Sequence, residues 1–336
     1  MARILVTRRL PDGGLDPLVD AGHELIGPHH DDVPYTHAEL VALAGEVDAI
    51  VCILADRVDA EVLDAGAAGS LRVVATVAVG FDNIDVAHAR SIGIAVCNTP
   101  GVLDDTTADL AFLLILGAAR RASDAAADLR AGRWRGWCMT DFLGQDVHGA
   151  TLGIVGYGRI GRAVARRASG FDMTVLHHSR TPTGEAGYVA DLDELLTTAD
   201  IVSLHVPLSD ATRHLIDARR LALMKPTAVL VNTARGPVVD EVALAAALHD
   251  GTIFAAGIDV YEREPEVHPD LLDAPHAMLL PHVGSASFAT RIRMSRLAAD
   301  GVNAILRGDT PPNVVTSPTA AATGPRVPPD FPLGAK

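Results

Sequence analysis

The stretch Thr151-Leu-Gly-Ile-Val-Gly-Tyr-Gly-Arg-Ile-Gly161 decides the fold. Its start is a short apolar run typical of a buried strand, and a helical stretch follows from Arg162. Between them, Gly156 allows a tight turn, Gly158 lets the backbone approach a pyrophosphate, and Gly161 lets helix and strand pack closely. The helix N-terminus offers free N–H groups to the phosphates. The stretch therefore predicts a dinucleotide site, with a simple glycine turn as the alternative; its residues are Gly156, Tyr157, Gly158, Arg159, Ile160 and Gly161.

The end of the next predicted strand, 173–177, indicates which dinucleotide binds. An NAD site usually has an acidic residue there, which binds the ribose 2′-hydroxyl. This chain has Ser179, Arg180 and Thr181 instead. A guanidinium and a hydroxyl can bind a 2′-phosphate, which a carboxylate would repel. We therefore expect a preference for NADP(H), with NAD(H) as the second candidate; a solvent-exposed loop arginine is the alternative interpretation.

Length and composition are typical of a soluble enzyme with two domains. The chain has 336 residues, of which 49% are hydrophobic, and this fits globular packing. Its net charge of −14 argues against a nucleic acid or an anionic membrane as partner. Three widely spaced cysteines show no metal-ligand spacing, so we expect no metal and reduced thiols in the cytoplasm. The N-terminal run Met1-Ala-Arg-Ile-Leu-Val is interpreted as a strand and not as a signal peptide. The longest apolar run, 110–119, is too short to cross a bilayer.

Strand-like and helical stretches alternate in two halves of the chain, which predicts two parallel sheets with helices on both faces. The expected strands are 3–7, 23–26, 49–54, 73–77 and 94–97 in the first half, and 151–156, 173–177, 201–205, 228–232, 254–259 and 278–280 in the second. A helix is expected over 105–127, and its middle is apolar on every side. Such a helix is predicted to be buried on all faces, either within the chain or in a homodimer. The segment 317–336 is rich in Pro, Ala, Thr and Gly and is predicted to be a flexible tail.

Three strand ends in the second half place polar side chains at one edge of the predicted sheet. Arg235, Glu264 and His282 follow the last three strands, and ligands of such sheets bind at the carboxyl ends of the strands. Arg235 can hold a substrate carboxylate through two parallel hydrogen bonds. His282 can protonate an alkoxide as hydride arrives from a nicotinamide, and Glu264 beside it would favour the charged imidazolium. Each residue could instead be an ordinary loop charge, so the inference depends on their convergence.

Four segments together resemble the D-isomer-specific 2-hydroxyacid dehydrogenases: Gly156–Gly161, Val231-Asn-Thr-Ala-Arg-Gly-Pro237, Gly257-Ile-Asp-Val-Tyr-Glu262 and Leu280-Pro-His-Val-Gly-Ser285. The resemblance covers about residues 3–316. It implies that Arg235, Glu264 and His282 are the catalytic set. It also implies a Rossmann cofactor domain, 100–287, inserted into a flavodoxin-like substrate domain made of 1–99 and 288–316. A long helix over 289–306 would return the chain to the substrate domain.

Within that family, the segments 75–85, 132–137 and 177–181 are similar to the glyoxylate/hydroxypyruvate reductase branch. The similarity implies that backbone N–H groups near Val79 and Gly80 bind the substrate carboxylate, and that Trp137 can reach the partner's active site across a dimer. It also implies further cofactor contacts: near the nicotinamide Thr107, Thr233 and Asp259, and near the adenine Val206 and Pro207.

The expected function is NAD(P)H-dependent reduction of a small 2-keto acid, glyoxylate or hydroxypyruvate, to the D-2-hydroxy acid. A D-3-phosphoglycerate-type dehydrogenase is one alternative, although it would normally prefer NAD and carry an acidic residue at the place of Ser179. A non-catalytic regulator that senses dinucleotides on the same scaffold is the other. The retention of Arg235, Glu264 and His282 favours turnover over sensing.

Overall fold

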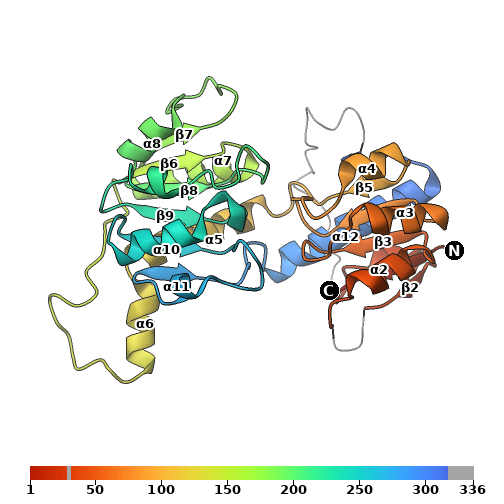
Figure 1. The fold of residues 1–336 in the computed structure, drawn as a ribbon, viewed down its shortest axis with the longest axis horizontal. Helices are drawn as coiled ribbons and strands as arrows, with labels where there is room; N and C mark the ends of the chain where they lie inside the picture. The colour runs from red at the N-terminus through yellow and green to blue at the C-terminus, as the bar shows by residue number, and fades with distance from the viewer. Residues whose placement is uncertain (29–31, 317–336) are drawn as a thin grey trace. The chain divides into compact units, whose positions relative to one another are not determined.

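The structure is a computed structural model, and it describes residues 1–28 and 32–316. The segment 317–336, predicted to be a flexible tail, lies outside the described residues. The chain divides into two compact units: unit 1 is Met1–Leu103 with the chain from Ser285 onward, and unit 2 is Asp104–Gly284. Each unit is built on a parallel β-sheet with helices on both faces (Figure 1). The predicted α/β fold class is therefore confirmed.

The described part of unit 1 contains a five-stranded parallel sheet with the order β2-β1-β3-β4-β5. This is the flavodoxin-like order. The strands are short and begin or end within two residues of their predicted positions: β1 (Arg3–Val6), β2 (Glu24–Ile26), β3 (Ala49–Cys52), β4 (Val73–Thr76) and β5 (Ala95–Cys97).

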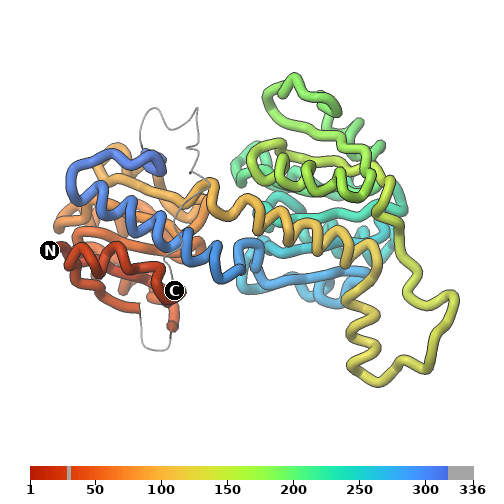
Figure 2. Tube along the Cα trace, turned by 180° about the vertical axis from the view of Figure 1, so that it is seen from behind, coloured from red at the N-terminus to blue at the C-terminus, as the bar shows by residue number. Residues whose placement is uncertain are grey.

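Alternate residues of these strands contact two separate hydrophobic cores, as the two-residue period of a strand requires. Leu5 and Ile50 face the core that is covered by α2 (His37–Ala44), α3 (Ala60–Ala68) and α4 (Val86–Ser91). Their neighbours Ile4 and Val51 face the core that is covered by α1 (Asp16–Asp20) and α12 (Phe288–Arg307). Figure 2 shows α12 crossing this second face. The long helix expected over 289–306 is therefore present and packs on the N-terminal sheet.

Unit 2 is described in full and contains a six-stranded parallel sheet with the order β11-β10-β9-β8-β6-β7. Tyr188 adds a parallel bridge to His177 at the outer edge of β7. With this bridge counted as a third strand, the order is that of dinucleotide-binding sheets. The strands are β6 (Thr151–Val155), β7 (Thr174–His178), β8 (Ile201–Leu204), β9 (Val229–Asn232), β10 (Ala255–Ile258) and β11 (Ala277–Leu279).

Helices cover both faces of this sheet. On one face, α5 (Asp104–Ala119) and α7 (Arg159–Ala168) pack on Ile154, Val229 and Val231 (Figure 2). The other face carries Leu204, Leu230 and Ile258. It is covered by α8 (Leu192–Thr198), α9 (Ala218–Leu221), α10 (Glu241–His249) and α11 (Pro269–Leu272), of which α8, α10 and α11 are labelled in Figure 1. In the described part of the chain, no helix is long and apolar enough to span a bilayer.

The prediction of one buried helix over 105–127 is wrong. It is two helices, α5 and α6 (Ala122–Arg130), and the chain turns at Arg121, whose φ is +52°. Leu113 of α5 is 48% exposed, and α6 has no buried residue. The physical reason is that α5 packs on the sheet and α7 through one side only. We call α6 together with the following residues 131–146 the arm, because they project from unit 2 (Figure 2).

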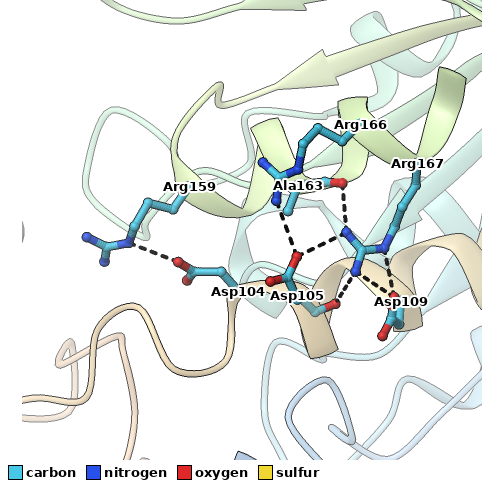
Figure 3. Close-up of polar contacts among 7 residues, drawn as sticks. All are labelled: Asp104, Asp105, Asp109, Arg159, Ala163, Arg166 and Arg167. Carbon is cyan, nitrogen blue, oxygen red and sulfur yellow. Dashed lines mark hydrogen bonds and ion pairs between the residues drawn. The ribbon is translucent and has the colours of Figure 1, made fainter. Parts of the chain in front are cut away.

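An ion-pair cluster fastens α7 to α5 (Figure 3). Arg167 donates hydrogen bonds to Asp109 Oδ1 at 2.7 Å, to the Asp105 carbonyl at 3.1 Å and to the Ala163 carbonyl at 2.9 Å. Arg166 contacts only the exposed Asp105 carboxylate among the residues drawn, at 3.2 Å. Since α7 is the helix that follows the glycine loop, this cluster holds the loop's helix in place.

Replacing Arg167 with alanine is expected to lower the free energy of unfolding by about 1–2 kcal/mol, because four hydrogen bonds of a largely buried guanidinium are lost. Replacing Arg166, whose side chain is 66% exposed, is expected to cost less than about 0.5 kcal/mol. Urea unfolding followed by circular dichroism measures both. Equal destabilisation by the two replacements would contradict the fastening role of Arg167.

Candidate active site

The glycine loop joins β6 to α7 at the carboxyl edge of the unit 2 sheet. Gly156 has φ +96°, and a Cβ there would lie 2.5 Å from the His205 carbonyl oxygen. A Cβ on Gly161 would collide with the Gly156 carbonyl. At Gly158, by contrast, a Cβ would meet no described atom within 4 Å, so the space in front of this residue is open. Two of the three glycines are therefore required by packing, and the middle one leaves room for a ligand.

The start of α7 fits a phosphate group. Gly158 is the N-cap and has no side chain to accept hydrogen bonds from the first-turn amides. Those amides and the helix dipole favour an anion at this end. Arg159 extends from the same turn, and its Nε lies 3.2 Å from Asp104 Oδ2 (Figure 3). Burial raises the pKa of Asp104 although the Arg159 charge opposes this.

The residues expected at the adenosine end of the dinucleotide lie beside the glycine loop or follow the strand that adjoins it. A Cβ on Gly156 would be 2.9 Å from Val206 Cγ1, so Val206, which precedes Pro207, adjoins the turn. The Gly156 amide donates to the His178 carbonyl at 2.9 Å, which places the end of β7 there too. Beyond it, Ser179 donates from Oγ to the Thr181 carbonyl at 2.7 Å, and Arg180 is exposed. The hydroxyl and the guanidinium thus lie on the loop where a ribose 2′-substituent would be read.

The loop after β9 carries Arg235 in a fixed backbone. The Asn232 side chain accepts from the Ala234 amide at 3.0 Å and donates to the Arg235 carbonyl at 2.9 Å. Gly236 follows, and a Cβ there would collide with the Tyr261 carbonyl group. This close approach brings the β9 loop directly against the loop after β10. The backbone at Arg235 is therefore held next to the segment that carries Glu264.

Glu264 and His282 form a hydrogen-bonded ion pair. His282 Nδ1 lies 2.8 Å from Glu264 Oε2, and Glu264 Oε1 accepts from the Tyr261 amide at 3.0 Å. The two side chains are 25% and 28% exposed, so the pair is shielded but reachable. Burial raises the pKa of Glu264, but the hydrogen bond and charge of His282, the Tyr261 amide and the Arg235 charge outweigh it and leave the pKa lowered. The carboxylate is therefore ionised at neutral pH.

Asp259 fixes the turn that presents His282. Its carboxylate accepts from the Val283 and Gly284 amides, each at 2.8 Å, and its carbonyl accepts from the His282 amide at 2.8 Å. The side chain is 1% exposed. Burial raises its pKa to about 6, although these amides and the His282 charge oppose the shift. His282 itself has φ +53°, a conformation that this turn imposes.

Two threonines, Thr233 and Thr107, lie near these groups. Thr233 Oγ1 is buried and has no hydrogen-bond partner within residues 1–28 and 32–316. A buried hydroxyl without a partner is costly, so this atom fits a ligand's polar group. Thr107 of α5 is 5% exposed, and its side chain lies 3.6 Å from the place of a Cβ on Gly284. The open glycine loop and the orphaned Thr233 hydroxyl together fit a bound dinucleotide.

Three of the predicted substrate contacts belong to other parts of the chain. Val79 and Gly80 belong to unit 1, where the Val79 carbonyl accepts from the Asn98 side chain at 2.8 Å. Trp137 lies on the arm and is 80% exposed. Among the described residues no group of His, Cys, Asp and Glu is arranged to hold a metal ion.

Sequence reasoning missed the residues that support the loops. Asn232, Glu241 and the Glu262 carboxylate hold backbone amides near Arg235 and Glu264. The one sequence feature that marks Glu241 is its position directly after Asp240, which is the N-cap residue of α10. An acidic residue in a first helical turn is ordinary, so the sequence alone gave no reason to single it out.

Comparison with known proteins agrees with this geometry. The family described as "D-isomer specific 2-hydroxyacid dehydrogenase, NAD binding domain" matches residues 112–284. The glyoxylate reductase of Thermococcus onnurineus is 45% identical over 322 residues, which are 93% of this chain and 95% of that protein. The crystal structure of the TT0316 protein from Thermus thermophilus is 44% identical with a TM-score of 0.87, and the alignment covers 93% of this chain and 99% of that one.

A further solved structure is an NADPH-dependent glyoxylate/hydroxypyruvate reductase from Sinorhizobium meliloti in complex with citrate. It is 35% identical with a TM-score of 0.82, over 95% of this chain and 99% of that one. The family match lies within unit 2 and includes the loops that carry the glycines, Arg235, Glu264 and His282. The similarity to whole relatives extends over both units. The chain therefore belongs to the D-isomer specific 2-hydroxyacid dehydrogenase family, as its four motifs implied, and is similar to the glyoxylate reductases within it.

Proposed function

We propose that this protein reduces a small 2-keto acid, such as glyoxylate or hydroxypyruvate, to the D-2-hydroxy acid with a nicotinamide dinucleotide. The observation that carries the proposal is the 2.8 Å pair of His282 and Glu264 at the same sheet edge as the glycine loop. The names of the relatives, which are glyoxylate reductases, support the substrate class. A sensing protein would have no need of a shielded imidazole–carboxylate pair there.

The chemistry divides between the dinucleotide and the protein. When bound, the reduced nicotinamide supplies the hydride that reaches C2 of the keto acid. His282 donates its proton to the carbonyl oxygen as the C=O bond becomes C–O–H, and it is left neutral. Glu264 stays ionised and stabilises the imidazolium before the transfer. In the reverse direction neutral His282 accepts the hydroxyl proton, so the same pair serves oxidation.

Substrate binding in this proposal uses a guanidinium and backbone amides. Arg235 binds the substrate carboxylate, or polarises its carbonyl, through charge-assisted hydrogen bonds. The Val79 and Gly80 amides add donors to the carboxylate. The net charge of −14 makes such local cationic and amide groups necessary for an anionic substrate.

We propose NADP(H) as the preferred cofactor, with NAD(H) accepted more weakly. Ser179 stands where an NAD site usually has a carboxylate, and exposed Arg180 follows it. A guanidinium and a hydroxyl favour a 2′-phosphate. The relative from Sinorhizobium meliloti, which is NADPH-dependent, supports this preference.

A panel of 2-keto acids, assayed with NADPH and with NADH by loss of absorbance, tests the function. We expect turnover of glyoxylate and hydroxypyruvate and a higher kcat/KM with NADPH. Equal or better kcat/KM with NADH would overturn the cofactor proposal alone. Absence of turnover with every keto acid, while the dinucleotide still binds in calorimetry, would overturn catalysis and favour the sensing alternative.

We also propose a homodimer in which the arm contacts a second copy. The arm exposes Leu129, Trp134, Trp137 and Met139, and each of these side chains is at least 58% exposed. Exposed apolar groups concentrated on one projection are typical of an interface. In the dimer Trp137 would line the partner's substrate site. A monomeric mass in sedimentation at micromolar concentration would contradict this assembly.

A further inference from the structure

The loop Tyr261–His268, which carries Glu264 between β10 and α11, is held by a carboxylate from another element. Glu241, the first residue of α10, accepts from the Glu262 amide through Oε1 at 2.6 Å. Its other oxygen, Oε2, accepts from the His268 amide at 3.3 Å. One carboxylate therefore binds the loop two residues before Glu264 and four residues after it.

The contact between the two segments is reciprocal. The Glu241 amide donates to Glu262 Oε1 at 2.9 Å, while the Glu262 amide donates to Glu241. This amide exchange satisfies an N–H group at the start of α10 that has no partner within the helix. The loop is thus attached to the helix by at least three hydrogen bonds, which we call the Glu241 clasp.

The clasp ends next to the Glu264–His282 pair. The Tyr261 amide donates to Glu264 Oε1 at 3.0 Å, and the adjacent Glu262 amide donates to Glu241. Two neighbouring amides of one loop therefore bind two different carboxylates. Because these two amides belong to consecutive peptide groups of one loop, we expect a displacement of the loop backbone that releases the Glu262 amide from Glu241 to shift the Tyr261 amide as well. Glu264 would then lose the hydrogen bond that orients its second oxygen toward His282.

Glu241 is an unusual residue to find buried. It is 7% exposed, and burial raises its pKa although the amides of Glu262 and His268 oppose this. Few carboxylates are buried so deeply without a cationic partner at hydrogen-bonding distance. The charged or titratable groups around it include Glu262, His268, Tyr261, Asp240 and His214; His214 lies 3.2 Å from Glu262 Oε2 and 4.0 Å from Asp240 Oδ2. Burying this carboxylate costs free energy, so the loop arrangement that its hydrogen bonds maintain is the feature to explain.

We propose that Glu241 is a positioning residue for the reaction: through the Glu262 and His268 amides it holds the loop so that Glu264 meets His282. This inference rests on the proposed function, since it assigns Glu241 a role in supporting the proton donor. Glu241 touches neither substrate nor dinucleotide in this role. It acts through the loop backbone and then through Glu264.

The test compares Glu241→Ala and Glu241→Gln with Glu266→Gln as the matched control. Glu266 is an exposed carboxylate on the same loop. Glu241→Gln keeps the side-chain length and one acceptor oxygen. Its NH₂ group faces the second backbone N–H group, and because both are donors no hydrogen bond can form there. We expect kcat for keto-acid reduction to fall about 10–100-fold in Glu241→Ala, as displacement of a reacting group by about 1 Å typically causes. Glu241→Gln should fall less, and Glu266→Gln should be unchanged.

The pH profile separates a positioning role from a purely structural one. Reduction needs protonated His282, so its rate falls on the alkaline side of the profile. Loss of the Glu264 contact should move that alkaline limb to lower pH in Glu241→Ala, in the same direction as in Glu264→Gln. In the Glu264→Gln background, adding Glu241→Ala should move the limb no further, because both changes act through one contact. The KM for the dinucleotide should stay the same throughout.

Several outcomes would overturn the inference. A Glu241→Ala enzyme with normal kcat and an unmoved alkaline limb would overturn it, and so would additive limb shifts in the double variant. If Glu241→Ala does not fold, Glu241→Gln alone must show the limb shift, with its melting temperature recorded beside it. Failure of the proposed function looks different: the unchanged enzyme would then turn over no keto acid, whereas failure of this inference leaves that enzyme active, His282→Ala strongly impaired and the Glu241 variants normal.

Discussion

Replacing His282 with alanine is expected to lower kcat for keto-acid reduction by about 10²–10⁴-fold, the usual contribution of a general acid. The physical reason is that the developing alkoxide loses its only positioned proton donor in the proposed mechanism, while Glu264 remains as an uncompensated carboxylate. Dinucleotide binding should change little, since the glycine loop lies on β6 and α7 and His282 follows β11. Steady-state kinetics of dinucleotide oxidation, with calorimetry for its binding, measures both quantities.

The control for this prediction is His148→Ala, which removes an exposed imidazole from the same unit. It should have the kcat and binding constants of the unchanged enzyme. A His282→Ala enzyme that turns over within a fewfold of the control would remove His282 from the mechanism. A loss of dinucleotide binding equal to the loss of kcat would show a general disruption of the site.

Replacing Arg235 with glutamine is expected to lower kcat/KM for the keto acid by at least about 10²-fold. Two charge-assisted hydrogen bonds to the substrate carboxylate would be lost, and each such bond contributes about 1.5–3 kcal/mol. Lysine at this position keeps the charge without the two-pronged geometry, so Arg235→Lys should recover only part of the loss. The effect should appear in KM as well as kcat, which distinguishes it from the His282 replacement.

The same replacement should also alter the pH dependence. The Arg235 charge is one of the effects that lower the pKa of Glu264, after burial, which raises it, and the His282 contacts, which lower it. Removing the charge raises that pKa toward its ordinary value. Glu264 then becomes protonated at a higher pH, so the acid limb of the pH–rate profile should move to higher pH. Arg263→Gln, which removes an exposed arginine near Glu264 in the chain, is the control, and equal losses in both variants would contradict the assignment.

Most of the strands were predictable because they are short and largely apolar runs. Parallel strands in a doubly wound sheet are buried on both faces, so their sequences carry no polar alternation, and β4, β8 and β9 begin and end close to the expected residues. The helix over 105–127 failed for the opposite reason. Its apolar composition predicted burial, but composition does not tell which sides have a neighbour; Leu113 stays half exposed, and α6 buries none of its residues.

The glycine turn and the strand ends could be read from the sequence, because a turn between a strand and a helix is a local event and a parallel sheet places its carboxyl ends at one edge. Sequence reasoning could place Arg235, Glu264 and His282 only at that edge. Their mutual arrangement depends on the parallel register of β9, β10 and β11 and on the close passage of Gly236 against Tyr261. The Glu241 clasp depends on it too, since it joins residues 21 and 27 apart in the chain. Contacts of this kind are made by backbone amides, which every residue except proline carries. No pattern of side chains in the sequence therefore predicts them, and only the tertiary structure determines which carboxylate accepts from which amide.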